Sequence, residues 1–100
     1  MKYRAIPTWV GDIRFDSKKE AARYTELLLL MKAGQIRNLE LQPNLDFIIE
    51  GKKIFTYRPD FIYFEDGKRV IEDVKGMKTP VYRLKKKLIE AQLKVQIRET

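Results

Sequence analysis

Two aspartates and a lysine stand out because their spacing suits chemistry on one face of a sheet. Asp73 and Lys75 are two residues apart in a strand-like run, and side chains at positions i and i+2 of a strand project from the same face. Glu72 must then point to the opposite face. Asp60 begins the preceding strand-like run, and the turn between the runs allows it to lie near Asp73. The sequence therefore predicts two carboxylates and an amine at one edge of a sheet.

This combination is suited to a divalent metal and to phosphodiester hydrolysis. Two neighbouring carboxylates repel each other unless a cation lies between them, and their hard oxygen donors suit Mg²⁺, with Mn²⁺ as a substitute. A metal held by Asp60 and Asp73 would polarise a phosphate, while Lys75 would position the attacking water or neutralise developing charge. The chain has no cysteine and no histidine, which excludes disulfides, thiolate or imidazole zinc sites and a Ser-His-Asp triad.

Turn and capping signals divide the chain into short elements of one domain. Hairpin turns are predicted at three glycine-containing pairs, which are Gly11-Asp12, Glu50-Gly51 and Asp66-Gly67. Asp16 or Ser17 caps a helix that ends before Gly34, and Thr79 caps a second helix. The expected strands cover residues 8–10, 13–15, 45–49, 54–57, 60–64, 68–75 and 95–97. This order predicts an α/β fold with helices on a central mixed sheet, in which the last strand runs parallel to its neighbour.

Helical periodicity assigns a packed face to each helix. A step of 100° per residue aligns Glu20 with a core-facing stripe of Tyr24, Leu27, Leu28 and Met31. In the second helix the same periodicity selects Val81, Leu84 and Leu88. A carboxylate on a packed face is costly to bury without a partner, which a metal would supply. Ser17 and Glu20 also have the spacing of a capping box, in which the glutamate reaches back to the cap amide, so both roles remain open.

The two central strands carry a resemblance to a known superfamily. Arg58-Pro59-Asp60 followed by Glu72-Asp73-Val74-Lys75 resembles the Pro-Asp…(Asp/Glu)-x-Lys signature of the PD-(D/E)xK nucleases. The resemblance implies a restriction-endonuclease-like αβββαβ core over residues 16–98, inside one nuclease domain spanning 1–100 that adds a small N-terminal hairpin. It also implies a Mg²⁺-dependent endodeoxyribonuclease. Asp60 and Asp73 would bind the metal, the backbone carbonyl of Val74 would be a further ligand, and Lys75 would be catalytic.

Two further resemblances bear on the first helix and on the substrate. Holliday junction resolvases and related phage and transposon endonucleases place a glutamate of the first helix in the metal site, and Glu20 resembles that residue. The chain is also similar to small phage-encoded proteins that share Phe15-Asp16-Ser17-Lys18-Lys19-Glu20, Leu41-Gln42-Pro43 and Val74-Lys75-Gly76. They imply a structure-selective endonuclease for branched or double-stranded DNA in phage recombination or DNA processing. Paired cuts would require a homodimer.

Each of these residues also has a structural interpretation. Asp60 follows a proline and can form a turn at a strand end. Asp73 and Lys75 can form an exposed salt bridge. Glu72 is expected to face solvent or to pair with a helix lysine, and it becomes a reserve ligand if the register slips by one residue. Gln42 is either a loop amide or a contact to the metal's water or the DNA backbone.

The charge balance predicts a polyanionic partner. The chain has 21 Lys and Arg against 14 Asp and Glu, a net charge of +7, and residues 76–100 alone carry seven basic and two acidic side chains, or +5. Candidate phosphate contacts after the catalytic strand are Lys78, Arg83, Lys85, Lys86 and Lys87. The same lysines are also typical of a solvated helix face.

Membrane contact is not expected. No apolar run approaches the roughly 20 residues that span a bilayer, and the N-terminus has no apolar signal core, so a cytoplasmic location is predicted, in the host if the protein is phage-encoded. The alternatives to a junction-selective nuclease are a nicking or packaging endonuclease of the same superfamily and a non-catalytic nucleic-acid-binding module on the nuclease fold. All the expected acidic and lysine positions are occupied, which favours an enzyme.

Overall fold

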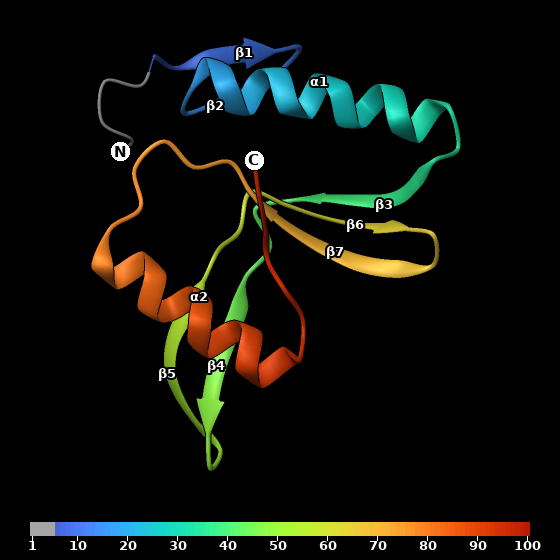
Figure 1. Ribbon diagram of the computed structural model, residues 1–100. Helices are drawn as coiled ribbons and strands as arrows, with labels where there is room; N and C mark the ends of the chain where they lie inside the picture. The colour runs from blue at the N-terminus through green and yellow to red at the C-terminus, as the bar shows by residue number, and fades with distance from the viewer. Residues whose placement is uncertain (1–5) are drawn as a thin grey trace.

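A four-stranded sheet lies between two helices in the computed structural model, which describes residues 6–100 (Figure 1). The elements in chain order are β1 Thr8–Val10, β2 Ile13–Phe15, α1 Lys18–Lys32, β3 Ile36–Leu41, β4 Leu45–Ile49, β5 Lys52–Tyr57, β6 Phe61–Glu65, β7 Lys68–Asp73, α2 Pro80–Leu93 and β8 Arg98–Glu99. The sheet order is β3-β6-β7-β8, with β7 and β8 parallel and the other pairs antiparallel. The predicted α/β class with a mixed sheet is confirmed.

The two faces of the sheet bury separate cores. Strand β6 alternates, so Phe61 and Tyr63 pack with Leu27 of α1 while Ile62 packs with Ile89 of α2. All five side chains are buried. Phe61 at the start of β6 and Asp73 at the end of β7 are both buried, so this end of the two inner strands is enclosed.

The start and end of α1 follow the predicted signals. Ser17 has an extended backbone, and its hydroxyl accepts from the backbone N–H of Glu20 at 3.1 Å, which satisfies one of the free amides of the first turn. The helix ends at Ala33, where Gly34 adopts φ +76°, a conformation that glycine tolerates without strain. Neither helix in residues 6–100 has the length and apolar content needed to cross a bilayer.

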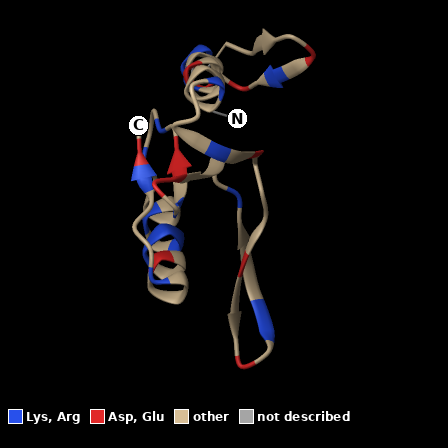
Figure 2. Ribbon diagram, turned by 90° about the vertical axis from the view of Figure 1, so that its right-hand side faces the viewer, with Lys and Arg blue, Asp and Glu red and all other residues tan. Residues whose placement is uncertain are grey.

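The first strand of the main sheet, β3, was not predicted. Its pairing with β6 shifts register between Arg37 and Glu40, and Asn38 has φ +56°. This bulge breaks the alternation of apolar and polar residues on which strand prediction depends. The predicted hairpin of β4 and β5 is present, but it forms a two-stranded sheet of its own that extends away from the main sheet beside α2 (Figure 2).

The packed face predicted for α2 is right at Leu88, which is half-buried against the second core, and wrong at Val81 and Leu84. Val81 and Leu84 are 61% and 58% exposed, whereas Ile89 is fully buried and Tyr82 is half-buried against the second core. The helix is therefore rotated so that Tyr82 and Ile89, seven residues apart, face the sheet. The last strand is Arg98–Glu99 rather than 95–97, and Ile97 just before it is buried.

Candidate active site

Asp60 and Asp73 meet where β6 begins and β7 ends. The backbone N–H of Asp60 donates to Oδ1 of Asp73 at 3.1 Å, and the backbone N–H of Val74 donates to Oδ2 of Asp60 at 2.7 Å. Each carboxylate is thus fixed by the strand that carries the other. Asp73 is 1% exposed, so the pair lies at the buried end of the two inner strands rather than on an open surface.

Lys75 lies two residues beyond the end of β7, beside this pair. Its Nζ is 3.7 Å from Oδ1 of Asp73 and 4.3 Å from the centroid of the Tyr82 ring. The backbone of Lys75 is held as well, because its N–H donates to the carbonyl of Thr100 at 3.2 Å and its carbonyl accepts from Nζ of Lys19 at 3.2 Å. The backbone that carries the Lys75 ammonium group is therefore held in place beside Asp73.

Glu20 and Asp60 both line a small cavity. The cavity has a volume of about 80 Å³, and its lining includes Glu20, Asp60 and Gln42. Glu20 is 1% exposed although it lies in the first turn of α1, where its backbone amide takes part in the cap. The N–H of Gln42 donates to the carbonyl of Asp60 at 3.0 Å, which places the Gln42 backbone beside the site.

The donor types of this site fit Mg²⁺. The carboxylates of Asp60 and Asp73 are interlocked by hydrogen bonds, and the buried Glu20 adds a third carboxylate on the cavity that Asp60 lines. In residues 6–100, as the side chains stand, no group of three or more carboxylates is close enough to hold a metal ion.

Tyr57 is a site residue that sequence reasoning assigned no role. It is the last residue of β5, and its hydroxyl donates to Oδ2 of Asp73. Because Tyr57 is buried, its hydroxyl needs a polar partner. Its hydrogen bond to Asp73 joins the β4–β5 hairpin to the site. The signal in the sequence was its position directly before Arg58-Pro59-Asp60.

Glu72 does not face solvent, and its partner on the helix is Arg23 rather than a lysine. It points away from Asp73, as predicted, but it is 0% exposed beneath α1. Arg23 of α1 binds it through two bonds, from Nε at 2.6 Å and from Nη2 at 3.0 Å. The hydroxyls of Tyr63 and Thr100 also donate to it, at 2.5 Å and 3.1 Å. Its carboxylate oxygens are engaged by fixed donors, so it serves the structure of this face rather than the site.

These contacts shift the pKa values of Glu72, Tyr63 and Arg23. Burial by itself would raise the pKa of Glu72, but the hydrogen bonds from Arg23, Tyr63 and Thr100 outweigh it and hold that pKa below its usual value of 4.5. Burial, together with the hydrogen bond to Glu72, raises the pKa of Tyr63 to about 12. The hydrogen bond to Glu72 also raises the pKa of Arg23. At neutral pH the group is a fully charged carboxylate and guanidinium pair.

A family match covers the chain from end to end. The family is described as a protein of unknown function, DUF1064, and its profile matches residues 1–100. The chain belongs to the DUF1064 family. No curated protein and no solved structure matches it. The family description names no activity.

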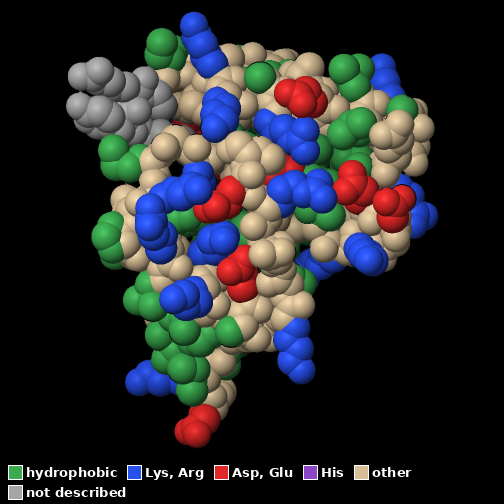
Figure 3. Space-filling model, in the orientation of Figure 1, with side chains coloured by type: hydrophobic (Ala, Val, Ile, Leu, Met, Phe, Trp, Pro, Cys, Tyr) green, Lys and Arg blue, Asp and Glu red, His purple; other side chains and the backbone are tan. Residues whose placement is uncertain are grey.

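Most of the predicted phosphate contacts line one groove beside α2. Lys and Arg side chains gather over α2 and the segment before it, with acidic side chains between them (Figure 3). The groove has a volume of about 330 Å³ and is lined by Lys78, Arg83, Lys86, Lys87, Glu90 and Glu99. Lys78 pairs with Glu99 at 3.1 Å and Lys86 with Glu90 at 3.4 Å. Lys85 is separate from this set, since its Nζ lies over the Phe55 ring at 5.4 Å.

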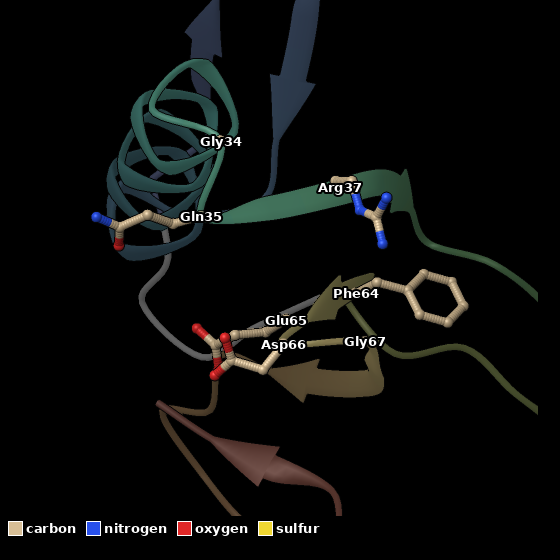
Figure 4. Close-up of a pocket in the computed structure, with 7 residues that line it drawn as sticks. All are labelled: Gly34, Gln35, Arg37, Phe64, Glu65, Asp66 and Gly67. Carbon is tan, nitrogen blue, oxygen red and sulfur yellow. The ribbon is translucent and has the colours of Figure 1, made fainter.

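A larger hollow lies at the opposite end of β6 and β7. It has a volume of about 590 Å³ between the turn that follows α1 and the β6–β7 turn (Figure 4). In the close-up, Arg37 lies on one side, and Glu65 and Asp66 lie on the other. Its polar groups do not converge, and it shares no residue with the Asp60 and Asp73 pair. It is not the candidate site.

Proposed function

We propose that this protein is a Mg²⁺-dependent DNA endonuclease that hydrolyses phosphodiester bonds. The observation that carries the proposal is the interlocked pair of Asp60 and Asp73, with the Lys75 ammonium 3.7 Å from Asp73, at one end of two antiparallel strands. Two carboxylates and an amine at such a position are the residue types that metal-assisted phosphodiester hydrolysis needs.

The order of elements supports a restriction-endonuclease-like core. With the β4–β5 hairpin set aside as an insertion, the chain from α1 to β8 reads αβββαβ, and β6 and β7 carry the acidic pair. Asp60 directly precedes β6 and Asp73 is the last residue of β7, so the acidic pair lies at one end of the two inner antiparallel strands, which supports such a core.

The roles follow from the contacts. Asp60 and Asp73 would hold the metal, with Glu20 and the Val74 carbonyl completing its ligands. When bound, Mg²⁺ stabilises charge on the phosphoryl oxygens and makes a water molecule more acidic. Lys75 carries a positive charge beside Asp73, where it can neutralise charge that develops on the phosphate or orient the water. Tyr57 fixes the orientation of the Asp73 carboxylate.

The basic groove supports DNA as the substrate, and branched DNA as the preferred form. Lys78, Arg83, Lys86 and Lys87 can contact phosphates, which position a duplex without reading its sequence. A small domain of this kind recognises shape and backbone, so a four-way junction cut by a homodimer is the proposed substrate. Nicking or packaging of other DNA structures is the alternative within the same chemistry.

Cleavage of a panel of DNAs tests the proposal. Purified protein is incubated with linear, nicked, flap and four-way substrates, with Mg²⁺ or with a chelator. We expect Mg²⁺-dependent cleavage that is fastest on the four-way junction. Asp73→Asn is expected to lower the cleavage rate by about 10³-fold or more, with DNA affinity kept or increased because one carboxylate no longer repels phosphate.

Asp66→Asn is the matched control. Asp66 is exposed in the β6–β7 turn with φ +53°, a conformation that asparagine adopts readily, so this variant should cleave as the parent does. DNA binding without cleavage of any substrate would identify a non-catalytic binding module instead. Cleavage by Asp73→Asn at the parent rate would remove Asp73 from the mechanism.

A further inference from the structure

The Lys75 ammonium is enclosed between a carboxylate and an aromatic ring. On one side is Oδ1 of Asp73 at 3.7 Å, and on the other is the centroid of the Tyr82 ring at 4.3 Å. A cation at this distance over a tyrosine ring is attracted by the negative charge of the ring face. Tyr82 belongs to α2, so the lysine is held between two elements on the same face of the sheet.

The Tyr82 ring is itself fixed from several sides. Its hydroxyl donates to Oε2 of Glu99 at 2.7 Å, and Nζ of Lys78 lies 3.1 Å from Oε1 of the same glutamate. Its ring packs against that of Tyr57, with centroids 6.5 Å apart. Its backbone N–H donates to the hydroxyl of Thr79 at the start of α2. Burial, followed by the hydrogen bond to Glu99, raises the pKa of Tyr82, so the hydroxyl stays protonated and keeps its hydrogen bond to Glu99.

We infer that Tyr82 is the positioning residue for Lys75, holding the ammonium over its ring so that the group points at Asp73. This inference rests on the proposed nuclease function. A lysine side chain has four rotatable bonds and, on a segment beyond the end of a strand, would otherwise sample many rotamers. The ring restricts that sampling without neutralising the charge, which a carboxylate in the same place would do.

The role of Tyr82 is also different from that of the aromatic residues that only fill the cores. Phe15 packs against Tyr24 with ring centroids 4.9 Å apart on the other face of the sheet, and Tyr24 lies nearly parallel to Phe61 with centroids 6.4 Å apart. Tyr82 instead bridges two charged groups. Its ring faces Lys75 and its hydroxyl binds Glu99.

The test compares Tyr82→Met with Tyr82→Phe. Methionine keeps the volume and the helix propensity without a ring face, whereas phenylalanine keeps the ring and loses only the hydroxyl. In the proposed nuclease assay, Tyr82→Met should lower kcat by between about fivefold and about 10²-fold, and KM for DNA should be nearly unchanged. Tyr82→Phe should recover most of that loss. Leu84→Ala, an exposed position on the same helix, is the control that should leave kcat unchanged.

A second measurement is independent of cleavage. Protons held over an aromatic ring are shifted upfield in an NMR spectrum, so the ε-methylene protons of Lys75 should lie upfield of those of other lysines in the parent and in Tyr82→Phe. The shift should vanish in Tyr82→Met. This spectrum also reports directly whether each variant is folded, and the parent spectrum alone tests the contact if Tyr82→Met does not fold.

The outcomes separate the two ideas. An active parent together with a Tyr82→Met variant whose kcat falls by less than fivefold overturns the positioning role and leaves the nuclease function standing. Equal losses in Tyr82→Met and Tyr82→Phe overturn it too, because the hydroxyl rather than the ring would then matter. If the parent cleaves no DNA, the nuclease function fails, and the NMR shift alone decides whether Tyr82 holds Lys75: its absence in the parent overturns the inference.

Discussion

Two neighbouring carboxylates on β7 differ in what surrounds them. Glu72 and Asp73 are 0% and 1% exposed and project from opposite faces of the sheet. Glu72 receives two bonds from one guanidinium and two more from hydroxyls. Asp73 receives a tyrosine hydroxyl and a backbone N–H, with an ammonium at 3.7 Å and a second carboxylate, Asp60, beside it.

The difference shows that burial of an acid does not by itself mark a functional site. The charge of Glu72 is balanced inside the chain by the bidentate guanidinium of Arg23, and the hydroxyls of Tyr63 and Thr100 occupy its remaining lone pairs. Asp73 instead lies beside another acid, with one ammonium group at 3.7 Å. Two carboxylates beside a single ammonium are suited to a divalent cation, whereas the charge of a bidentate ion pair is already balanced.

Removing the guanidinium should have the largest effect on stability. Arg23→Leu leaves Glu72 buried at 0% exposure without its cation, and breaking a buried pair in this way costs about 3–5 kcal/mol of unfolding free energy. Urea denaturation of the parent and the variant measures the difference.

Arg14→Leu is the matched control for Arg23→Leu. Arg14 and Asp16 form an ion pair at 3.2 Å in which both side chains are half exposed, and such pairs contribute about 0–1 kcal/mol. Equal losses in the two variants would mean that the Glu72 pair is no more important than a surface contact, and the distinction drawn between the two faces of β7 would be lost.

The two buried tyrosines sharpen the same comparison. Tyr63 donates to Glu72 and Tyr57 donates to Asp73, so each can be changed to phenylalanine with its ring retained. Tyr63→Phe should lower the unfolding free energy by about 1.5–3 kcal/mol, with cleavage unchanged. Tyr57→Phe should raise the Mg²⁺ concentration for half-maximal cleavage by about tenfold, because a hydrogen bond that orients a metal ligand is lost.

Titration of cleavage against Mg²⁺, together with thermal unfolding, distinguishes the two tyrosine variants. A carboxylate has about four lone-pair sites, so Tyr57 and a metal can bind Asp73 at the same time. An unchanged Mg²⁺ dependence in Tyr57→Phe would assign Tyr57 to the core alone. A changed Mg²⁺ dependence in Tyr63→Phe would connect the Glu72 face to the site.

The sequence was informative where local periodicity decides the structure. The two-residue period placed Asp73 and Glu72 on opposite faces, and the Asp66-Gly67 turn placed Asp60 beside Asp73. It was uninformative where partners come from distant elements. Arg23 and Glu72 are 49 residues apart, and which helix side chain lies over β7 depends on the rotation of α1 on the sheet. The role of Tyr82 depends on how α2 is rotated on the sheet. The apolar stripe of Val81 and Leu84 predicted the wrong rotation, because both side chains are exposed.

The smallest of the expected effects is in the pH dependence of stability, and it isolates Glu72 directly. The folded-state pKa of Glu72 lies below 4.5, so its contribution to stability is complete above that value. As the pH falls, the unfolded chain takes up the proton first, and stability is lost until the folded-state pKa is passed. This group adds a slope of at most about 1.4 kcal/mol per pH unit.

Glu72→Gln should therefore be less stable than the parent at neutral pH, and its unfolding free energy should fall less steeply with acid below pH 4.5. Glu99→Gln supplies the comparison. The pKa of Glu99 is also lowered, first by the hydrogen bond from Tyr82. Its side chain is 25% exposed, so solvent weakens the contribution of this group to stability. Urea denaturation at a series of pH values measures the slopes. Parallel curves for the parent and Glu72→Gln would show that the guanidinium does not hold this carboxylate ionised, and the contrast with Asp73 would then need another cause.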